Sequence, residues 1–188
     1  MVARISVGKN LYGALAYNQN KVDEGGAKVL SAHLLRYPED GRFRPDESVR
    51  QFLEWMPNHY RTEKPVIHIS LNPHPDDVLT DGQLAEIGRE YMQRLGYGNQ
   101  PYLVFKHEDI GRHHIHIVSL RVDSEGRKVS DKFEYRRSKE ITELLEQKYG
   151  LHPAEGRKKG EKWQLKPVDV AKGDIKRQIA CTLKPLLE

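Results

Sequence analysis

Residues 102–123, YLVFKHEDIGRHHIHIVSLRVD, decide the fold expected for this chain of 188 residues. The two ends of the stretch, 102–107 and 114–122, are rich in strand-forming residues, and the second largely alternates apolar with polar side chains. The segment between them is polar and contains Gly111, which is typical of a turn. The stretch therefore predicts a β-hairpin.

Three histidines fall at one end of this predicted hairpin. His114 and His116 are two residues apart, so they share a face of their strand. If the hairpin closes symmetrically, His107 lies opposite His114 and shares that face, whereas His113 points the other way. Three neutral imidazoles that converge on one point are typical of a divalent-metal site with open coordination positions. Ordinary surface histidines are the alternative.

The rest of the chain alternates strand and helix patterns around the hairpin. Residues 66–71 predict a strand with His68 and Ser70 on the face opposite its apolar side chains. Further strands are expected at 2–7 and 29–33, with a short one at 128–130, and a polar loop at 21–26. Helices are expected at 10–17, 45–56, 80–95, 138–145 and 169–187, the fourth capped by Ser138 and packing Ile141, Leu144 and Leu145 inward. Because the central strand pair is a hairpin, the sheet must be at least partly antiparallel, and the expected class is a single α+β domain.

Composition limits the possible classes of protein. Charged residues make up 31% of the chain and mean hydropathy is −0.74. No stretch reaches the roughly 18 apolar residues that a membrane-spanning helix needs, and no secretory signal is recognised in residues 1–10. The single cysteine, Cys181, excludes a disulfide within the chain and fits a reducing cytoplasm.

A mildly basic balance permits a polyanionic partner without requiring one. Lysine and arginine outnumber the acidic residues by 31 to 27, and the pI is near 9.0. Arg157, Lys158 and Lys159 form a cluster followed by Lys162 and Trp163. This segment is either a solvated loop or a track for nucleic-acid phosphates with Trp163 as a stacking surface.

Residues 107–131, HEDIGRHHIHIVSLRVDSEGRKVSD, resemble the metal motif of the relaxase and mobilisation nuclease family, which belongs to the HUH endonucleases that start conjugative DNA transfer. That motif runs H-x-D-x-x-x-x-H-x-H and ends in a D-x-x-G turn. Residues 5–22, ISVGKNLYGALAYNQNKV, resemble the N-terminal tyrosine motif of the family, and most closely that of Bacteroides-type mobilisation relaxases. Residues 66–73, VIHISLNP, resemble its middle serine motif.

The resemblance implies a ferredoxin-like palm with the metal site on its central hairpin, and it implies roles for particular residues. Tyr17 matches the catalytic tyrosine, with Tyr12 as the competitor. Asp109 matches the acidic position, where it would orient a ligand imidazole or help to deprotonate the tyrosine, although a turn-stabilising role is the alternative. Ser70 matches the serine that contacts DNA near the nick. Lys21, close to Tyr17, would hold a phosphate or would simply be solvated.

The function expected on these grounds is that of a relaxase. It would nick single-stranded DNA at an origin of transfer, using Mg²⁺ or Mn²⁺, with Zn²⁺, Co²⁺ or Ni²⁺ possible as bound ions. The resemblance implies a 5′-phosphotyrosyl intermediate, accessory mobilisation proteins as partners and a cytoplasmic location. Residues 1–188 are expected to form a single nuclease domain, either by itself or, because family members usually extend further, as the N-terminal part of a longer protein.

Three alternatives stay open at this point. The first is another HUH enzyme, such as a plasmid replication initiator or a transposase, although in the transposases the tyrosine normally follows the histidines. The second is a metal-dependent hydrolase that uses activated water and leaves no covalent adduct. The third is a DNA-binding module with a structural metal, which would bind DNA without cutting it.

Overall fold

A five-stranded sheet organises the computed structural model, which describes residues 1–40, 42–108 and 113–154. The strand order is β1-β3-β5-β4-β2, and each of the four strand pairings is antiparallel. The strands are β1 (Val2–Gly8), β2 (Ala27–His33), β3 (Val66–Asn72), β4 (Tyr102–His107) and β5 (His114–Leu120). Residues 1–154 form one compact unit. The predicted helix at 169–187, with Cys181, lies outside the described residues.

The central hairpin is confirmed. Strands β4 and β5 lie side by side in the middle of the sheet, with His107 opposite His114 and Phe105 opposite His116. Strand β3 pairs with the other edge of β5 and places Ser70 opposite His116. The predicted division of β3 is also confirmed, since Ile67, Ile69 and Leu71 are fully buried. The register therefore brings polar residues of β3 beside the histidines of β5.

The helix after β1 is longer than its sequence predicted. Helix α1 (Leu11–Asp23) is capped by Asn10, whose side chain accepts a hydrogen bond from the Gly13 amide, and it includes the first three residues of the polar loop expected at 21–26. Val22 packs against the core cluster beneath the helix, which favours a further turn before Gly25 ends it at a φ of 76°. Tyr17 consequently lies within the helix and not at its end.

Two helices in the middle of the chain begin as their sequences predict. Helix α2 (Pro45–Glu54) has proline in its first turn, although Leu53, expected on its apolar face, is exposed. Helix α3 (Asp81–Met92) is capped by Thr80, which forms a reciprocal capping box with Gln83. A short π-helical turn, η1 (Gln93–Tyr97), extends α3 to the region where the sequence predicted its end.

The last described helix differs from its prediction at the N-terminus. Helix α4 (Glu134–Tyr149) starts four residues before Ser138, which is buried and hydrogen-bonded to the Tyr91 hydroxyl at 2.6 Å instead of capping the helix. Leu144, expected to point inward, is exposed, whereas Ile141 and Leu145 are buried. The strand expected at 128–130 is reduced to a single bridge between Val122 and Lys128.

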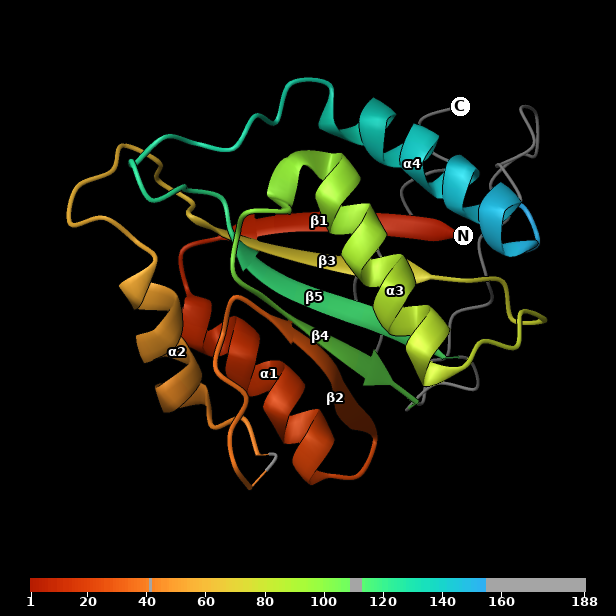
Figure 1. Ribbon diagram of the computed structural model, residues 1–188, viewed down its shortest axis with the longest axis horizontal. Helices are drawn as coiled ribbons and strands as arrows, with labels where there is room; N and C mark the ends of the chain where they lie inside the picture. Colours follow the sequence, from red (N-terminus) through yellow and green to blue (C-terminus); the bar gives the residue numbers. More distant parts are fainter. Residues whose placement is uncertain (41, 109–112, 155–188) are drawn as a thin grey trace, which may run out of the picture. The chain divides into compact units, whose positions relative to one another are not determined.

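Helices cover both faces of the sheet, which confirms the predicted α+β class. Helices α3 and α4 lie over one face, and α3 crosses in front of the strands in Figure 1. Their side chains pack on the apolar side of β3 and β5, including Ile69 and Ile117. Helices α1 and α2 pack on the opposite face against Leu103, Phe105 and Val118. The three histidines lie on this second face. His116 pairs directly with Phe105, and His107 and His114 lie two residues along the same strands, so their side chains point to the same side.

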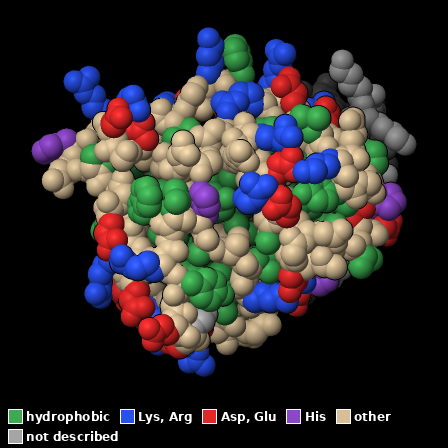
Figure 2. All heavy atoms as spheres, in the orientation of Figure 1, with side chains coloured by type: hydrophobic (Ala, Val, Ile, Leu, Met, Phe, Trp, Pro, Cys, Tyr) green, Lys and Arg blue, Asp and Glu red, His purple; other side chains and the backbone are tan. Residues whose placement is uncertain are grey.

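The charged side chains on the face shown in Figure 2 carry both signs. Lysine and arginine side chains alternate there with aspartate and glutamate, so the excess of positive charge is not gathered into one patch on this face. Several of these charges are paired, as in Arg89 with Glu86 and Lys148 with Glu90. Among the described residues, no helix is long and apolar enough to cross a membrane.

Candidate metal centre and nucleophile

His107, His114 and His116 form a cluster at one end of the central hairpin. Each offers one ring nitrogen such that the three atoms lie within 4.8 Å of one another. His107 is fully buried, His114 is buried, and His116 is partly exposed. Cross-strand pairing of His107 with His114 and the two-residue spacing to His116 produce this convergence.

The environment of the cluster keeps His116 neutral. Burial, followed by the neighbouring His107, His68 and His114, lowers its pKa to about 3. Burial also lowers the pKa of His68. A neutral imidazole has a lone pair available for a cation, so His116 is in its ligand form at neutral pH.

The donor set fits a divalent metal ion. Three imidazole nitrogens from two adjacent strands are a common set for first-row metals, and they leave further positions for substrate or water. The nitrogens are near enough to one another for small side-chain movements to bring all three into coordination distance.

Tyr17 lies directly beside this cluster. Its ring stacks on His107 with centroids 6.0 Å apart, and it approaches His116 edge-on at 6.3 Å. Helix α1 holds the tyrosine there by burying Leu11 and Leu15 against the sheet. The side chain is nevertheless 49% exposed, so it contacts both the histidines and the solvent.

Tyr12 occupies a different position on the same helix. It is as exposed as Tyr17, at 50%, but within the described part of the chain it makes no ring contact with a histidine. Five residues of α-helix rotate the two side chains to different directions. Of these two tyrosines, Tyr17 is therefore the one that lies beside the histidine cluster.

One residue of the centre was missed in the sequence, and another was noticed without a role. Asn18 is fully buried, and its Oδ1 lies 2.8 Å from Nε2 of His107. The signal was present, because Asn18 continues the buried stripe of Leu11 and Leu15, where a polar side chain is unusual. His68 had been recognised on the correct face but without a role, and its Nε2 lies 2.8 Å from Nδ1 of His116.

Ser70 is the direct cross-strand neighbour of His116. It is half-buried, pairs directly with His116 across β3 and β5, and accepts a hydrogen bond from Asn72 Nδ2 at 3.2 Å. On its other side Ser70 pairs with Arg4 of β1, whose side chain is exposed. Directly paired residues share a face, so Arg4, Ser70 and His116 form a continuous row.

Lys21 follows Tyr17 by one helical turn. It is partly exposed, and its Nζ lies 3.4 Å from Glu24 Oε2. This spacing places it on the same side of α1 as Tyr17. Its position is compatible with a phosphate contact next to the tyrosine.

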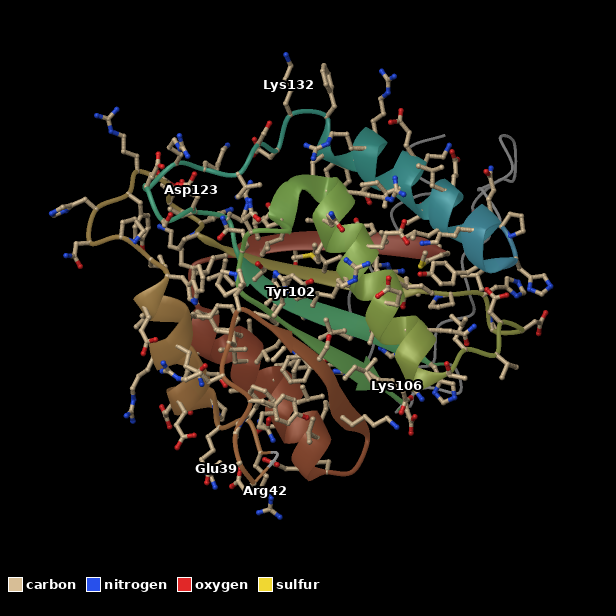
Figure 3. All side chains as sticks on the ribbon, in the orientation of Figure 1. Glu39, Arg42, Tyr102, Lys106, Asp123 and Lys132 are labelled. Carbon is tan, nitrogen blue, oxygen red and sulfur yellow. The ribbon has the colours of Figure 1, made fainter. Side chains whose placement is uncertain are left out.

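Several candidate residues do not join the described centre. Asp109 and the basic cluster Arg157, Lys158 and Lys159 lie outside the described residues. Glu108, which precedes Asp109, pairs with Lys106, labelled in Figure 3. The Nζ of Lys106 lies 2.7 Å from the Glu108 carboxylate and also pairs with Asp81 at the start of α3.

His113 does not belong to the histidine cluster, as expected from its side chain pointing to the opposite face of the strand. It is exposed, and its Nδ1 lies 3.5 Å from Glu108. The group of converging ligand nitrogens does not include it.

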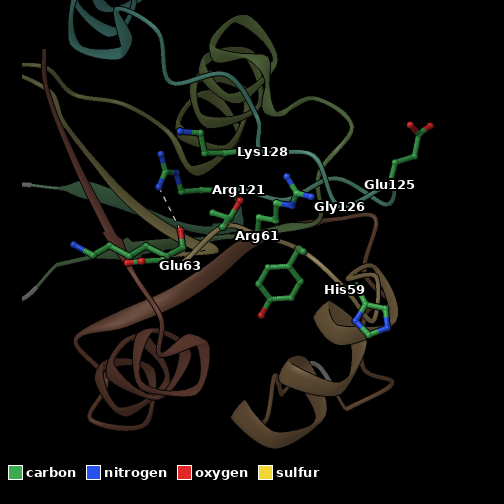
Figure 4. Close-up of a pocket in the computed structure, with 10 residues that line it drawn as sticks. His59, Arg61, Glu63, Arg121, Glu125, Gly126 and Lys128 are labelled. Carbon is green, nitrogen blue, oxygen red and sulfur yellow. Dashed lines mark hydrogen bonds between the residues drawn. The ribbon is translucent and has the colours of Figure 1, made fainter.

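A cavity of about 810 Å³ lies at the opposite end of the sheet (Figure 4). It is bordered by residues 59–64 and by Arg121, which follows the last residue of β5. Arg121 donates to the Lys64 carbonyl and pairs with Asp131, and Lys128 pairs with the same aspartate. These contacts engage Arg121 and Lys128, and the length of β5 separates the cavity from His114.

The fold is thus an antiparallel sheet flanked by helices, with a three-histidine cluster fit to hold a metal ion and a tyrosine beside that cluster. The family model for relaxases, described as MobA/VirD2-like, nuclease domain, matches residues 17–151. The chain therefore belongs to the relaxase family, and the matched part contains Tyr17, Ser70 and the three histidines. No curated protein matches the chain in a sequence search.

Proposed function

We propose that the protein is a DNA relaxase that nicks single-stranded DNA at an origin of transfer, with Tyr17 as the nucleophile. The observation that carries this proposal is the contact of the Tyr17 ring with His107 and His116, two members of the converging histidine cluster. Membership of the relaxase family supports the same reading.

The proposed reaction is a transesterification. Tyr17 Oη forms a bond to phosphorus while the bond from phosphorus to the 3′-oxygen breaks. The tyrosine loses its proton, and the departing oxygen gains one to become a free 3′-hydroxyl. The product carries a 5′-phosphotyrosyl bond that conserves the phosphodiester energy, so the strand can be rejoined without another energy source.

Each residue of the centre has a distinct task in this reaction. His107, His114 and His116 would hold a divalent ion, Mg²⁺ or Mn²⁺ in use, and a bound ion would supply polarisation and orientation of the phosphoryl group. Helix α1 positions Tyr17 on the open side of the cluster, and exposure of its ring leaves room for the substrate. Asp109 is proposed as the acidic partner that orients an imidazole or accepts the tyrosine proton.

The DNA is proposed to approach along the open face of β1 and β3. Ser70 would contact the strand near the nick, Lys21 would contact a phosphate beside Tyr17, and the basic cluster at 157–159 would extend the contact. The physiological partners are then an origin of transfer and accessory mobilisation proteins, and the site of action is the cytoplasm.

The order of the residues along the chain favours a relaxase over a transposase. Tyr17 precedes His107 by 90 positions (107 minus 17), whereas the transposase tyrosine normally follows the histidines. A replication initiator stays distinguishable by its substrate, since it would act at a replication origin.

The test is incubation of the protein with end-labelled single-stranded DNA and Mn²⁺, followed by a denaturing gel and mass spectrometry of digested adduct. We expect a covalent DNA–protein species whose peptide carries the nucleotide on Tyr17. Cleavage without any adduct would replace the proposal with a hydrolase that uses activated water. Metal and DNA binding without cleavage would replace it with a binding module.

A further inference from the structure

His68 makes a specific contact with one of the proposed metal ligands. His68 on β3 and His116 on β5 are diagonal neighbours, because Ser70 pairs with His116 and His68 pairs with Val118. The two rings are 4.9 Å apart between centroids, and Nε2 of His68 lies 2.8 Å from Nδ1 of His116. This distance is that of a hydrogen bond.

The chemistry of imidazole decides the direction of that bond when His116 binds an ion. A neutral ring has one N–H and one lone pair. With Nδ1 engaged by His68, the nitrogen that remains for an ion is Nε2, so the proton must reside on Nδ1. His116 then donates to Nε2 of His68, which accepts and carries its own proton on Nδ1.

We propose that His68 is a positioning residue of the metal centre, which accepts the Nδ1 proton of His116 and thereby presents Nε2 of His116 to the ion. The inference rests on the metal site of the proposed function. Side chains that hold the second nitrogen of a ligand histidine fix its tautomer and ring orientation, and they increase its basicity.

A second ligand is held in a similar manner. Asn18 Oδ1 lies 2.8 Å from Nε2 of His107, so it accepts from that nitrogen. His107 and His116 are thus held by side chains from a helix and from a neighbouring strand. The position of His68 also matches a supporting role. Its ring contacts His116, but it is not among the three histidines whose nitrogens converge.

Metal affinity is the direct measure of this role. Isothermal titration with Mn²⁺ should be carried out on the parent protein, on His68→Phe, which keeps a ring but has no acceptor, and on His68→Gln, whose Oε1 can accept. We expect His68→Phe to weaken binding by about 10- to 100-fold and His68→Gln to recover most of the affinity. His113→Phe is the matched control, because His113 is exposed and outside the cluster.

The outcomes separate this inference from the proposed function. A parent that binds no Mn²⁺ removes the metal site and both proposals with it. A parent that binds while His68→Phe binds equally well, with circular dichroism showing both folded, overturns the role of His68 alone. Equal weakening in His68→Phe and His68→Gln also overturns it, because an acceptor would then not suffice.

Nuclear magnetic resonance can identify the bonded nitrogens. With ¹¹³Cd²⁺ as the probe and ¹⁵N-labelled histidine, we expect couplings from the ion to His107, His114 and Nε2 of His116. A coupling to His68 would make it a fourth ligand and overturn the positioning role. A coupling to Nδ1 of His116 would overturn it as well, because that nitrogen could not then donate to His68.

Discussion

The ring of Tyr17 stacks on the ring of His107, with their centroids 6.0 Å apart and their planes inclined by 27°. One residue comes from the middle of helix α1 and the other from the last position of strand β4. The adjacent Asn18 contacts the same histidine through Oδ1. Two successive side chains of helix α1 therefore contact the histidine cluster, and these contacts set the position of the proposed nucleophile.

Replacement of Tyr17 by phenylalanine tests the nucleophile. The change removes one oxygen and keeps the ring that contacts His107, so Mn²⁺ and DNA affinities should stay near those of the parent. Cleavage should fall by several orders of magnitude, because water is poorly placed to replace a positioned hydroxyl. Gel assays of labelled DNA and parallel binding titrations measure the two effects.

Tyr12→Phe is the matched control for that experiment. It alters an equally exposed tyrosine of the same helix, and most activity should remain. An adduct that maps to Tyr12, or to a tyrosine after the histidines such as Tyr135 or Tyr149, would overturn the assignment of Tyr17.

Replacement of His114 or His116 by alanine tests the metal ligands. Either change removes one of three converging nitrogens, so Mn²⁺ binding should weaken sharply and cleavage should be lost while the fold persists. His113→Ala should have little effect on either quantity. Calorimetry that gives equal metal affinities for His114→Ala and the parent would exclude the site.

The central hairpin could be predicted because its information is local. Strand-forming residues along 102–107 and alternation along 114–120 define the two strands, and a symmetric closure places His107 opposite His114. The faces of β3 followed from the same period of two. These short-range rules were sufficient to bring the three histidines together.

Other parts of the site depend on contacts that are distant in sequence. The bond between His68 and His116 requires β3 to pair with β5 in one register, which alternation alone does not specify. The end of α1 was misplaced because packing of Val22 outweighs the polar character of its neighbours. Ser138 has the composition of a cap, but a buried partner, the Tyr91 hydroxyl, engages it within the helix.

The depressed pKa of His116 predicts a loss of stability in acid for the metal-free protein. Its pKa is about 3 in the folded chain against an ordinary value of 6.5, so below pH 6.5 the unfolded chain binds a proton that the folded chain excludes. The free energy of unfolding should fall as pH drops from 6.5 toward 3, by at most about 1.4 kcal/mol per pH unit from this group.

Urea denaturation in the presence of a chelator, at several pH values, measures this effect. His116→Gln lacks the titrating ring, so its stability should depend less steeply on pH between 6.5 and 4 than that of the parent. His113→Gln should follow the parent. Parallel pH profiles for His116→Gln and the parent would contradict the assigned pKa.

Neutralising Arg157, Lys158 and Lys159 tests the late basic cluster. If these residues contact phosphates, the affinity for single-stranded DNA should fall with rising salt, and the logarithmic slope should lose roughly 0.7 per contact removed. A triple glutamine variant compared with the parent over a range of salt concentrations measures both. An unchanged slope and affinity would identify the cluster as a solvated segment.

Arg4 provides a test of the proposed DNA path across the sheet. It pairs with Ser70, which pairs with His116, so two strand spacings, or about 10 Å, separate Arg4 from the ligand strand. Its exposed guanidinium is thus placed to bind a phosphate next to the one that is cleaved. Arg4→Gln should weaken binding of single-stranded DNA several-fold and reduce the salt slope by roughly 0.7, while Mn²⁺ affinity stays unchanged.

Arg136→Gln is the matched control, since it removes the same charge from an exposed arginine of α4, on the other face of the sheet. Equal DNA affinities for Arg4→Gln and Arg136→Gln would show that the strand does not cross β1, and the path would then have to leave the centre on the side of Lys21.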